Sequence, residues 1–349
     1  KAQNALKHIT DKIEIKTLEW TSLTHTIAVG DILISMLPAT MHIQVAELCL
    51  AKKAHFVSSS YISPAMQALH EKAIASSLCF VNEVGLDPGL DHILAHALVN
   101  NYKSSEHYNS NNELYFRSYC GGFPKVANDF KYKFSWSPLG VLKALKSPAK
   151  WLEQGKVGTS NAPWEALADY SIDLPNGQET FQCYPNRDSL PFIAQYQLNN
   201  ENVQQFVRGT LRLAGWSTAW AGLFDQVASL TSAACVATAE QALKTISEEL
   251  ERKYSYAEHE PDRVVLHVEL VAKKAGKKLW QQSYLLDSCG NEKGQAMSRL
   301  VSIPVSFAIE SGINGTAKVG VSAAPHQTDE VAMWMNKLTD MGEEITLVN

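Results

Sequence analysis

Two carboxylates and an imidazole lie close together in the segment Gly85–His92, which reads Gly-Leu-Asp-Pro-Gly-Leu-Asp-His. Carboxyl and imidazole side chains held at one place are the usual means of moving a proton in general acid–base catalysis. The apolar run before them predicts a buried strand over 78–84, and the apolar positions after them recur at helical spacing. We therefore expect Asp87 to be the N-cap of a helix with Pro88 at its first position. Capping alone is the simpler alternative for Asp87.

Two shorter apolar runs upstream, over 31–37 and 55–59, also predict buried strands. A helical segment follows each of them, the first with Thr40 and the second with Ser63 as the expected cap. Strands that alternate with helices at this short spacing predict a parallel sheet with right-handed crossovers.

Ligands of such sheets bind at the carboxyl ends of the strands. Pro38, Tyr61 and Asp87 each follow a predicted strand, so we expect one crevice to hold all three. His92 lies one helical turn beyond Asp87 and is expected to brace the site rather than react. Four further histidines have no comparable context and are interpreted as packing or surface residues: His42, His55, His70 and His96.

Longer strands with alternating apolar residues predict a second, largely antiparallel sheet beyond residue 102. Arg208 and Arg212 are four positions apart on one strand, so their guanidinium groups face the same side. A bidentate guanidinium is the best available partner for a carboxylate, whereas a structural ion pair is the simpler alternative. The predicted strands are 113–119, 181–184, 205–213, 264–272 and 279–286, and the covering helices are 138–146 and 216–253.

Six ordered motifs resemble the family of saccharopine dehydrogenase (glutamate-forming), also called saccharopine reductase. Motifs of this length in this order are far more specific than a lone glycine pattern. They occupy Ser58–Pro64, Asn82–His92, Ser118–Gly122, Tyr132–Pro138, Tyr184–Ser189 and Arg208–Arg212.

The resemblance implies an oxidoreductase of lysine metabolism that uses NAD or NADP. Its reaction interconverts saccharopine with glutamate and 2-aminoadipate 6-semialdehyde through an imine, which requires a group that handles protons and a clamp for three carboxylates. The composition favours a cytoplasmic location, and a homodimer is the assembly expected for a fold of this type.

The resemblance also assigns residues to the site. The catalytic candidates are Tyr61, Asp87 and Cys120. The substrate-binding candidates are Ser60, Asp87, Gly121, Gly122 and Arg208, and the cofactor-binding candidates are Leu37, Pro38, Ser59, Tyr61 and Leu86. Packing is the simpler alternative for Cys120, because a reactive thiol needs a lowered pKa. We expect the acidic corner at Asp87 and the guanidinium of Arg208 to face each other across a gap wide enough for a tricarboxylate.

The glycine-rich turn that brings a backbone close to a cofactor pyrophosphate is absent from this sequence. The predicted fold is therefore an incomplete Rossmann-type parallel sheet over 1–96, with the first βαβ portion missing and the given sequence interpreted as part of a longer protein. A second α/β domain with a mostly antiparallel sheet is predicted over 97–290. The segment 291–349 is expected to return to the first domain.

Composition places few limits beyond an ordinary globular protein. The 349 residues carry 31 basic and 36 acidic side chains, a net charge of −5, without basic runs that favour nucleic acid. The Ala/Ser/Thr-rich stretch 226–243 is too polar to span a membrane. Six scattered cysteines form no CxxC pair, so no metal site is expected.

Two alternatives remain open at this point. The first is a related imine-reducing dehydrogenase of the carboxynorspermidine or opine type, which also joins an amine to a carbonyl. The second is a non-catalytic homologue that keeps the fold but lacks the cofactor turn.

Overall fold

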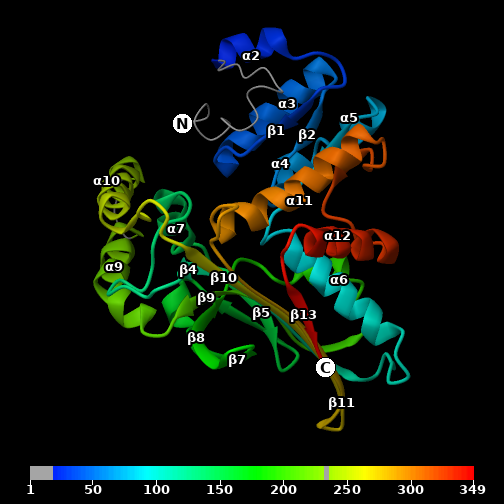
Figure 1. Cartoon of the computed structure of the whole chain (residues 1–349), viewed down its shortest axis with the longest axis vertical. Helices are drawn as coiled ribbons and strands as arrows, with labels where there is room; N and C mark the ends of the chain where they lie inside the picture. Colours follow the sequence, from blue (N-terminus) through cyan, green and yellow to red (C-terminus); the bar gives the residue numbers. More distant parts are fainter. Residues whose placement is uncertain (1–18, 232–235) are drawn as a thin grey trace.

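A computed structural model describes residues 19–231 and 236–349 of the chain. A small parallel sheet with its helices lies above a large mixed sheet, and a helical layer separates the two (Figure 1). The first 18 residues of the predicted first domain (1–96) and one of the six cysteines, Cys235, lie outside the described residues.

The small sheet has the strand order β1-β2-β3-β12, with all pairs parallel. Its strands are β1 (Ile32–Ile34), β2 (His55–Val57), β3 (Cys79–Val81) and β12 (Gly320–Ser322). The predicted parallel sheet is confirmed, although the third strand ends at Val81 rather than at residue 84. The first three strands are apolar and short, as expected for a sheet covered on both faces.

Short helices precede or connect the first three strands: α2 (Trp20–Thr26) comes before β1, and the connections contain η2 (Ala39–Met41), α3 (His42–Lys52), α4 (Pro64–Gln67) and α5 (His70–Ala75). Ser63 caps α4 as predicted, since its side chain accepts the N–H of Met66. The predicted cap at Thr40 is wrong because this residue lies inside the 3-10 turn η2, and α3 begins after it at His42 without a side-chain cap.

The large sheet follows the order β13-β11-β10-β4-β9-β5-β6, with β7 and β8 joined through β9. Most pairs are antiparallel, as predicted, but β4 and β9 run parallel. The strands are β4 (Glu113–Pro124), β5 (Ala149–Glu153), β6 (Lys156–Ser160), β7 (Ala168–Leu174), β8 (Gly177–Pro185), β9 (Asn202–Leu213), β10 (Asp262–Lys274), β11 (Lys277–Cys289) and β13 (Ile345–Val348).

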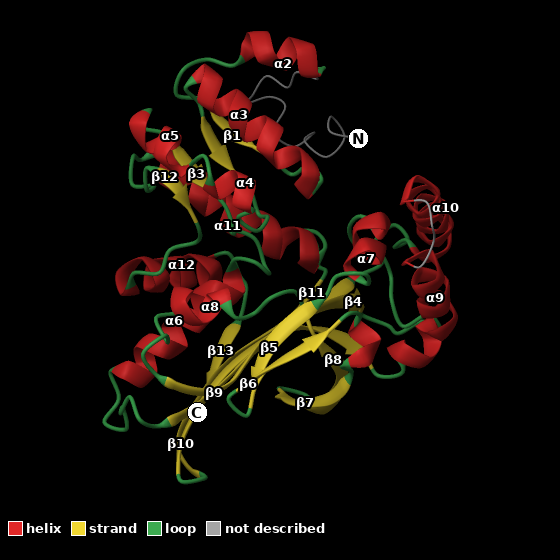
Figure 2. Cartoon of the chain, turned by 180° about the vertical axis from the view of Figure 1, so that it is seen from behind, coloured by secondary structure: helices red, strands yellow, loops and turns green. Residues whose placement is uncertain are grey.

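Four helices lie between the two sheets (Figure 2): α6 (Leu90–Lys103), α8 (Pro191–Gln195), α11 (Ala296–Ile313) and α12 (Thr328–Asp340). Nearly every side chain of α6 is buried, polar ones included. This helix and one face of the large sheet form the main apolar core, which contains Leu94, Phe116, Phe206 and Leu266. Because α6 is enclosed on all sides, charged groups at its start must find partners inside the protein.

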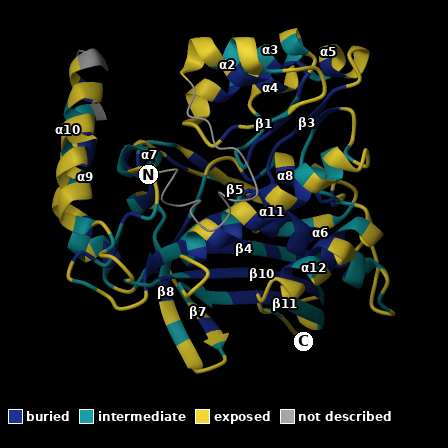
Figure 3. Cartoon of the chain, turned by 45° about the horizontal axis from the view of Figure 1, so that its top comes forward, coloured by how far each residue is buried: buried dark blue, intermediate teal, exposed yellow. Residues whose placement is uncertain are grey.

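Three more helices pack at the far end of the large sheet: α7 (Pro138–Ala144), α9 (Trp216–Thr231) and α10 (Val236–Tyr254). Trp216 and Trp220 anchor them in a separate aromatic cluster. Figure 3 shows that α9 and α10 expose much of their surface, whereas β4 and β10 are buried.

The chain crosses between the two sheets near its end. After α11, the strand β12 pairs with β3 of the small sheet, and β13 then pairs with β11 of the large one. The predicted domain boundaries stay a prediction. In the part of the chain that the structure describes, no helix is long and apolar enough to cross a membrane.

Candidate active site

The segment after β3 forms a tight turn before α6. Gly85 donates to the carbonyl of Pro88, and Leu90 donates back to the carbonyl of Gly85. The helix begins at Leu90 with Gly89 as its N-cap, so the prediction that Asp87 caps it with Pro88 at the first position is wrong. Instead, the carboxylate of Asp91 accepts the N–H of Gly89 at 2.7 Å. The carboxylate of Asp87 therefore has no part in capping α6.

Arg208 on β9 takes up both carboxylates of this turn. Its Nη2 donates to Asp87 Oδ1 at 2.8 Å and to Asp91 Oδ2 at 2.5 Å, and its Nε donates to Asp91 Oδ2 at 3.1 Å. Tyr61, after β2, donates its hydroxyl to Asp87 Oδ1 at 2.8 Å and accepts from Arg208 Nη2. We call these four residues the Asp–Arg cluster. Three segments far apart in the sequence therefore meet at one point.

The expected gap between Asp87 and Arg208 is absent. Their side chains are in direct contact, and the guanidinium is buried against the ring of Phe192, 4.1 Å from its centroid. A buried carboxylate and guanidinium pair directly because either charge left unpartnered inside a protein is costly. Of the three guanidinium nitrogens of Arg208, only Nη1 forms no hydrogen bond with the described residues. This nitrogen therefore keeps its hydrogen-bond donors for a ligand.

The two carboxylates differ in environment and therefore in protonation. Burial raises the pKa of Asp87, and the negative charge of Asp91 adds to this more than Arg208 offsets it. Burial would also raise the pKa of Asp91, but His92, Arg208 and the Gly89 N–H outweigh it and hold that pKa below its ordinary value. The side chain of Asp87 is 18% exposed and that of Asp91 0%. Asp87 is thus the carboxyl that can be reached and can change its proton.

Two further arginines, Arg187 and Arg212, belong to the elements that carry this cluster or contact it. The exposed Arg187 lies over the ring of Tyr61, 5.0 Å from its centroid. Among the described residues, Arg187 forms no ion pair with its neighbour Asp188, which accepts the N–H of Leu190 and lies 3.8 Å from the ammonium of Lys150.

Arg212 lies on the same face of β9 as Arg208, as predicted. Its guanidinium is enclosed by the rings of Tyr132, Tyr184 and Trp216, each about 5 Å away. Its Nε is buried without a hydrogen-bond partner, and no carboxylate within the described ranges forms an ion pair with it. A buried cation without an anion is uncommon in proteins. It indicates a place where an anionic ligand would be stabilised.

A second layer of polar contacts holds the cluster. His92 Nδ1 lies 2.7 Å from the hydroxyl of Tyr196, and its Nε2 lies 3.4 Å from Glu83. Burial would raise the pKa of Glu83, but the adjacent ring of His92 and the hydrogen bonds from the Ile62 N–H and Gln195 hold it below its ordinary value. His92 thus contacts residues on both sides of the cluster, the bracing position expected of it.

The thiol of Cys120 faces the cluster from β4 but is not activated. Burial raises its pKa well above the ordinary value, and Asp87 and Asp91 add to this. The neighbouring glycines allow close packing. A Cβ at Gly121 would lie 2.5 Å from the carbonyl oxygen of Leu211, and one at Gly122 would collide with Met297. The space beside each glycine is therefore filled by another part of the protein, Leu211 at Gly121 and Met297 at Gly122.

The sequence interpretation missed the role of His42. This buried side chain lies 2.8 Å from Ser35 at its Nδ1 and 2.8 Å from Ser60 at its Nε2. It thereby connects the ends of β1 and β2. Ser60 was predicted to bind the substrate, but its hydroxyl is hydrogen-bonded to His42. Burial lowers the pKa of His42, so it is a neutral hydrogen-bonding group. The sequence feature that could have indicated this role is the position of His42 at the start of the helix that follows β1.

The predicted cofactor residues separate into two groups. Leu37 and Pro38 are exposed at the end of β1, beside the exposed side chains of Met36 and Met41. Ser59 is half-buried after β2, near Tyr61. Leu86, in contrast, belongs to the main apolar core.

Metal ligands do not gather at the site. Over residues 19–231 and 236–349, no three His, Cys, Asp or Glu side chains come together as a metal ion would require.

Comparison with known proteins identifies the family of the chain. The model of the saccharopine dehydrogenase C-terminal domain matches residues 85–343, and that of the saccharopine dehydrogenase NADP binding domain matches residues 1–81. The chain is 29% identical to a saccharopine dehydrogenase [NADP(+), L-glutamate-forming] of Pyricularia oryzae, covering 84% of this chain and 79% of that protein. It is 34% identical to an alpha-aminoadipic semialdehyde synthase of Arabidopsis thaliana over 65% of this chain, but spans only 22% of that protein.

A solved structure is also similar along the whole chain. The apo saccharopine dehydrogenase (L-Glu forming) of Saccharomyces cerevisiae superposes with a TM-score of 0.77 at 26% identity. The superposition covers 100% of this chain and 92% of the yeast one. The resemblance inferred from the motifs is confirmed: the chain belongs to the saccharopine dehydrogenase family.

Proposed function

We propose that this protein is an oxidoreductase acting on a secondary amine. With a nicotinamide cofactor and water, it converts saccharopine into glutamate and 2-aminoadipate 6-semialdehyde, and the reverse. The observation that supports this most strongly is Asp87, a partly exposed carboxyl with a raised pKa at the carboxyl ends of the small sheet. The printed names of the relatives point to the same reaction.

The proton chemistry is assigned to Asp87 and Tyr61. Forming and hydrolysing an imine requires a group that gives and takes a proton near neutral pH. Burial holds the pKa of Tyr61 well above its ordinary value, so its hydroxyl stays protonated and serves as a donor. A bound anionic substrate would raise the pKa of Asp87 further. Asp87 then acts as the acid and base, and Tyr61 orients it.

The charges of the substrate are matched by three arginines. Saccharopine carries three carboxylates, and a guanidinium is the best partner for each. Arg208 offers its free Nη1, Arg187 is exposed beside Tyr61, and Arg212 has no anionic partner among the described residues. Cys120 on β4 pairs with Thr210, which stands between Arg208 and Arg212 on β9. We propose its neutral thiol as a contact of the substrate.

The residues after β1 fit the nicotinamide, which is the reactive end of the cofactor. Met36, Leu37 and Met41 expose apolar surface after β1, and the hydroxyl of Ser59 lies 3.9 Å from the sulfur of Met36. Such a surface suits the flat face of a nicotinamide, and these side chains would hold it while the cofactor supplies or accepts the hydride. The residues described contain no glycine-rich turn at a helix N-terminus, so they hold no pyrophosphate in the usual way. NADP is the cofactor named for the relatives.

A steady-state assay of the chain tests this function. We expect reduction of NADP⁺ or NAD⁺ that depends on saccharopine, with glutamate as a product. Turnover of carboxynorspermidine or an opine in place of saccharopine would favour the related imine reductases. No turnover of any of them, in a chain that binds saccharopine, would favour the non-catalytic homologue.

Assembly and location belong to the same proposal. A homodimer is proposed for the protein and is tested by sedimentation of the purified chain. A cytoplasmic location also stays a prediction, because relatives such as the alpha-aminoadipic semialdehyde synthase of Rattus norvegicus are named mitochondrial. Cell fractionation decides between the two.

A further inference from the structure

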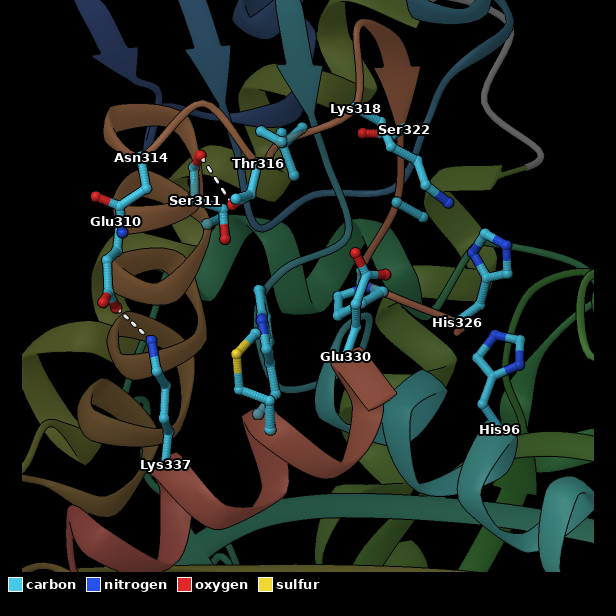
Figure 4. Close-up of a pocket in the computed structure, with 18 of the residues that line it drawn as sticks. His96, Glu310, Ser311, Asn314, Thr316, Lys318, Ser322, His326, Glu330 and Lys337 are labelled. Carbon is cyan, nitrogen blue, oxygen red and sulfur yellow. Dashed lines mark hydrogen bonds and ion pairs between the residues drawn. The ribbon is translucent and has the colours of Figure 1, made fainter. Parts of the chain in front are cut away.

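A groove with a volume of about 910 Å³ lies between α6, α11, α12 and β12 (Figure 4). None of the four cluster residues lines it. Part of its wall is apolar and includes Ala308, Val321, Met333 and Trp334. Its size falls in the range of small-molecule sites, which combine an apolar wall with a few placed polar groups.

One polar group in this groove is a buried histidine without a partner. His96 is 4% exposed, and its ring makes no hydrogen bond with any described residue. Its surroundings are the rings of Tyr196 and His326, with centroids 5.2 and 5.9 Å away. Burial, together with His92 and His326, lowers the pKa of His96 to about 3, so the ring is neutral. His96 lines the groove, and a neutral imidazole there offers a ligand one hydrogen-bond donor and one acceptor.

The groove also holds one unpaired cation and one unpaired anion. The ammonium of Lys337 is ion-paired with Glu310 at 2.5 Å, so these two charges satisfy each other. Lys318 and Glu330 form no ion pair within the ranges that the structure describes. Both act on His326, because Lys318 lowers and Glu330 raises its pKa, although burial has the largest effect. Figure 4 shows Lys318, His326 and Glu330 among the side chains that line the groove.

We propose that this groove binds a free α-amino acid, with its carboxylate at Lys318 and His96 and its ammonium at Glu330. A ligand with only a negative charge would be repelled by Glu330. A ligand with only a positive charge would be repelled by Lys318. A zwitterion satisfies both charges and the free imidazole, and its side chain packs on Met333 and Trp334. The groove and the proposed reaction use different residues, so either can fail without the other.

Titration calorimetry on the purified chain tests the proposal with L-leucine as the probe. Two comparison probes keep the same apolar side chain, 4-methylpentanoate without the ammonium and isoamylamine without the carboxylate. We expect saturable binding of L-leucine, and binding about tenfold or more weaker for either comparison probe, since each loses a charged hydrogen bond.

Two variants locate the site. Lys318→Met removes the unpaired ammonium and is expected to weaken L-leucine binding about tenfold or more. The matched control is Lys337→Met, which removes a lysine of the same groove already paired with Glu310, and it should leave the affinity for L-leucine within about twofold. His96→Leu should also weaken binding, and its thermal unfolding reports whether the fold is kept.

Three results would overturn the proposal. One is the absence of saturable L-leucine binding at millimolar concentration. Another is equal affinity for L-leucine in the wild type and in Lys318→Met. The third is binding of 4-methylpentanoate as tight as that of L-leucine, which would remove the role of Glu330.

Discussion

At the scale of single residues, the site depends on two aspartates that look alike in the sequence and differ in the structure. Asp87 and Asp91 both bond Arg208, but only Asp87 has an accessible side chain and a raised pKa. Asp91 is held ionised by His92, Arg208 and a backbone N–H. We therefore expect Asp87 to carry the proton chemistry and Asp91 to carry the structure.

Asp87→Asn is expected to remove one limb of the pH–rate profile. The wild-type carboxyl must lose its proton before it acts as a base in saccharopine oxidation, so activity falls as the pH drops through its raised pKa. The amide has no such transition. Measuring kcat/KM against pH checks this, and circular dichroism checks that the variant is folded. A profile with the wild-type shape would exclude Asp87 as the proton-handling group.

Asp91→Asn is expected to lower the free energy of unfolding more than Asp87→Asn does. Loss of the fully buried carboxylate leaves the guanidinium of Arg208 without its closest anion, which typically costs about 3–5 kcal/mol. Asp87 is partly exposed, so its loss is screened by solvent. Urea unfolding of both variants compares them. A larger loss for Asp87→Asn would contradict this division of roles.

Arg212→Met is expected to raise KM for saccharopine by about tenfold or more while changing KM for the cofactor little, since one substrate carboxylate loses a charged partner. The matched control is Arg263→Met. Arg263 lies in the same sheet but is already paired with Asp287 and Glu179. Steady-state kinetics measure both. Equal effects of the two substitutions would show that Arg212 serves stability and not the substrate.

At the scale of elements, the site exists because the turn after β3, the strand β9 and the segment after β2 converge. The parallel pairing of β4 with β9 places Ser118 beside Arg208 and Cys120 beside Thr210. Gly121 allows the backbone of β9 to come close at this point, since a Cβ there would meet Leu211. The glycine thus acts on the site through strand packing.

Gly121→Ala is therefore expected to destabilise the protein by about 1–3 kcal/mol, the usual effect of overpacking a core. Gly222→Ala is the control, because a Cβ at that position of α9 meets nothing within 4 Å. Alanine is the better helix former, so Gly222→Ala should be neutral or slightly stabilising. Thermal unfolding measures both. A wild-type stability for Gly121→Ala would show that the two strands can separate without cost.

At the scale of the whole molecule, a buried layer of charges connects the two sheets. Glu83 follows a strand of the small sheet and contacts α6 through His92 and α8 through Gln195. Its pKa is lowered, although burial opposes this, so the folded state binds its proton more weakly than the unfolded chain. Its contribution to stability is complete above the ordinary pKa of about 4.3 and is lost as the pH falls below it.

Glu83→Gln is expected to be less stable than the wild type at neutral pH, and the difference should shrink as the pH falls below about 4. The control is Glu71→Gln, an exposed residue of α5, which should follow the wild type at every pH. Urea unfolding at a series of pH values measures this. A difference between Glu83→Gln and the wild type that is independent of pH would contradict the assignment.

Local patterns were sufficient for much of the fold. Apolar runs predicted the three short strands of the small sheet, and alternation predicted the long strands of the large one, because both depend on neighbouring residues. The cap at Ser63 followed in the same way. The start of α6 was mispredicted because the turn at Gly85–Gly89 is closed by backbone bonds, and Asp91 from the following turn supplies the carboxylate.

The sequence by itself determined the family, the two kinds of sheet and the residue types at the site, since these reside in motifs and spacing. Only the tertiary structure decided which charges meet. It placed Arg208 directly on Asp87 and Asp91, left Arg212 among aromatic rings, and joined His42 to Ser60. The physical reason is that partners and pKa values depend on burial and on distances between segments far apart in the chain, which no local pattern contains.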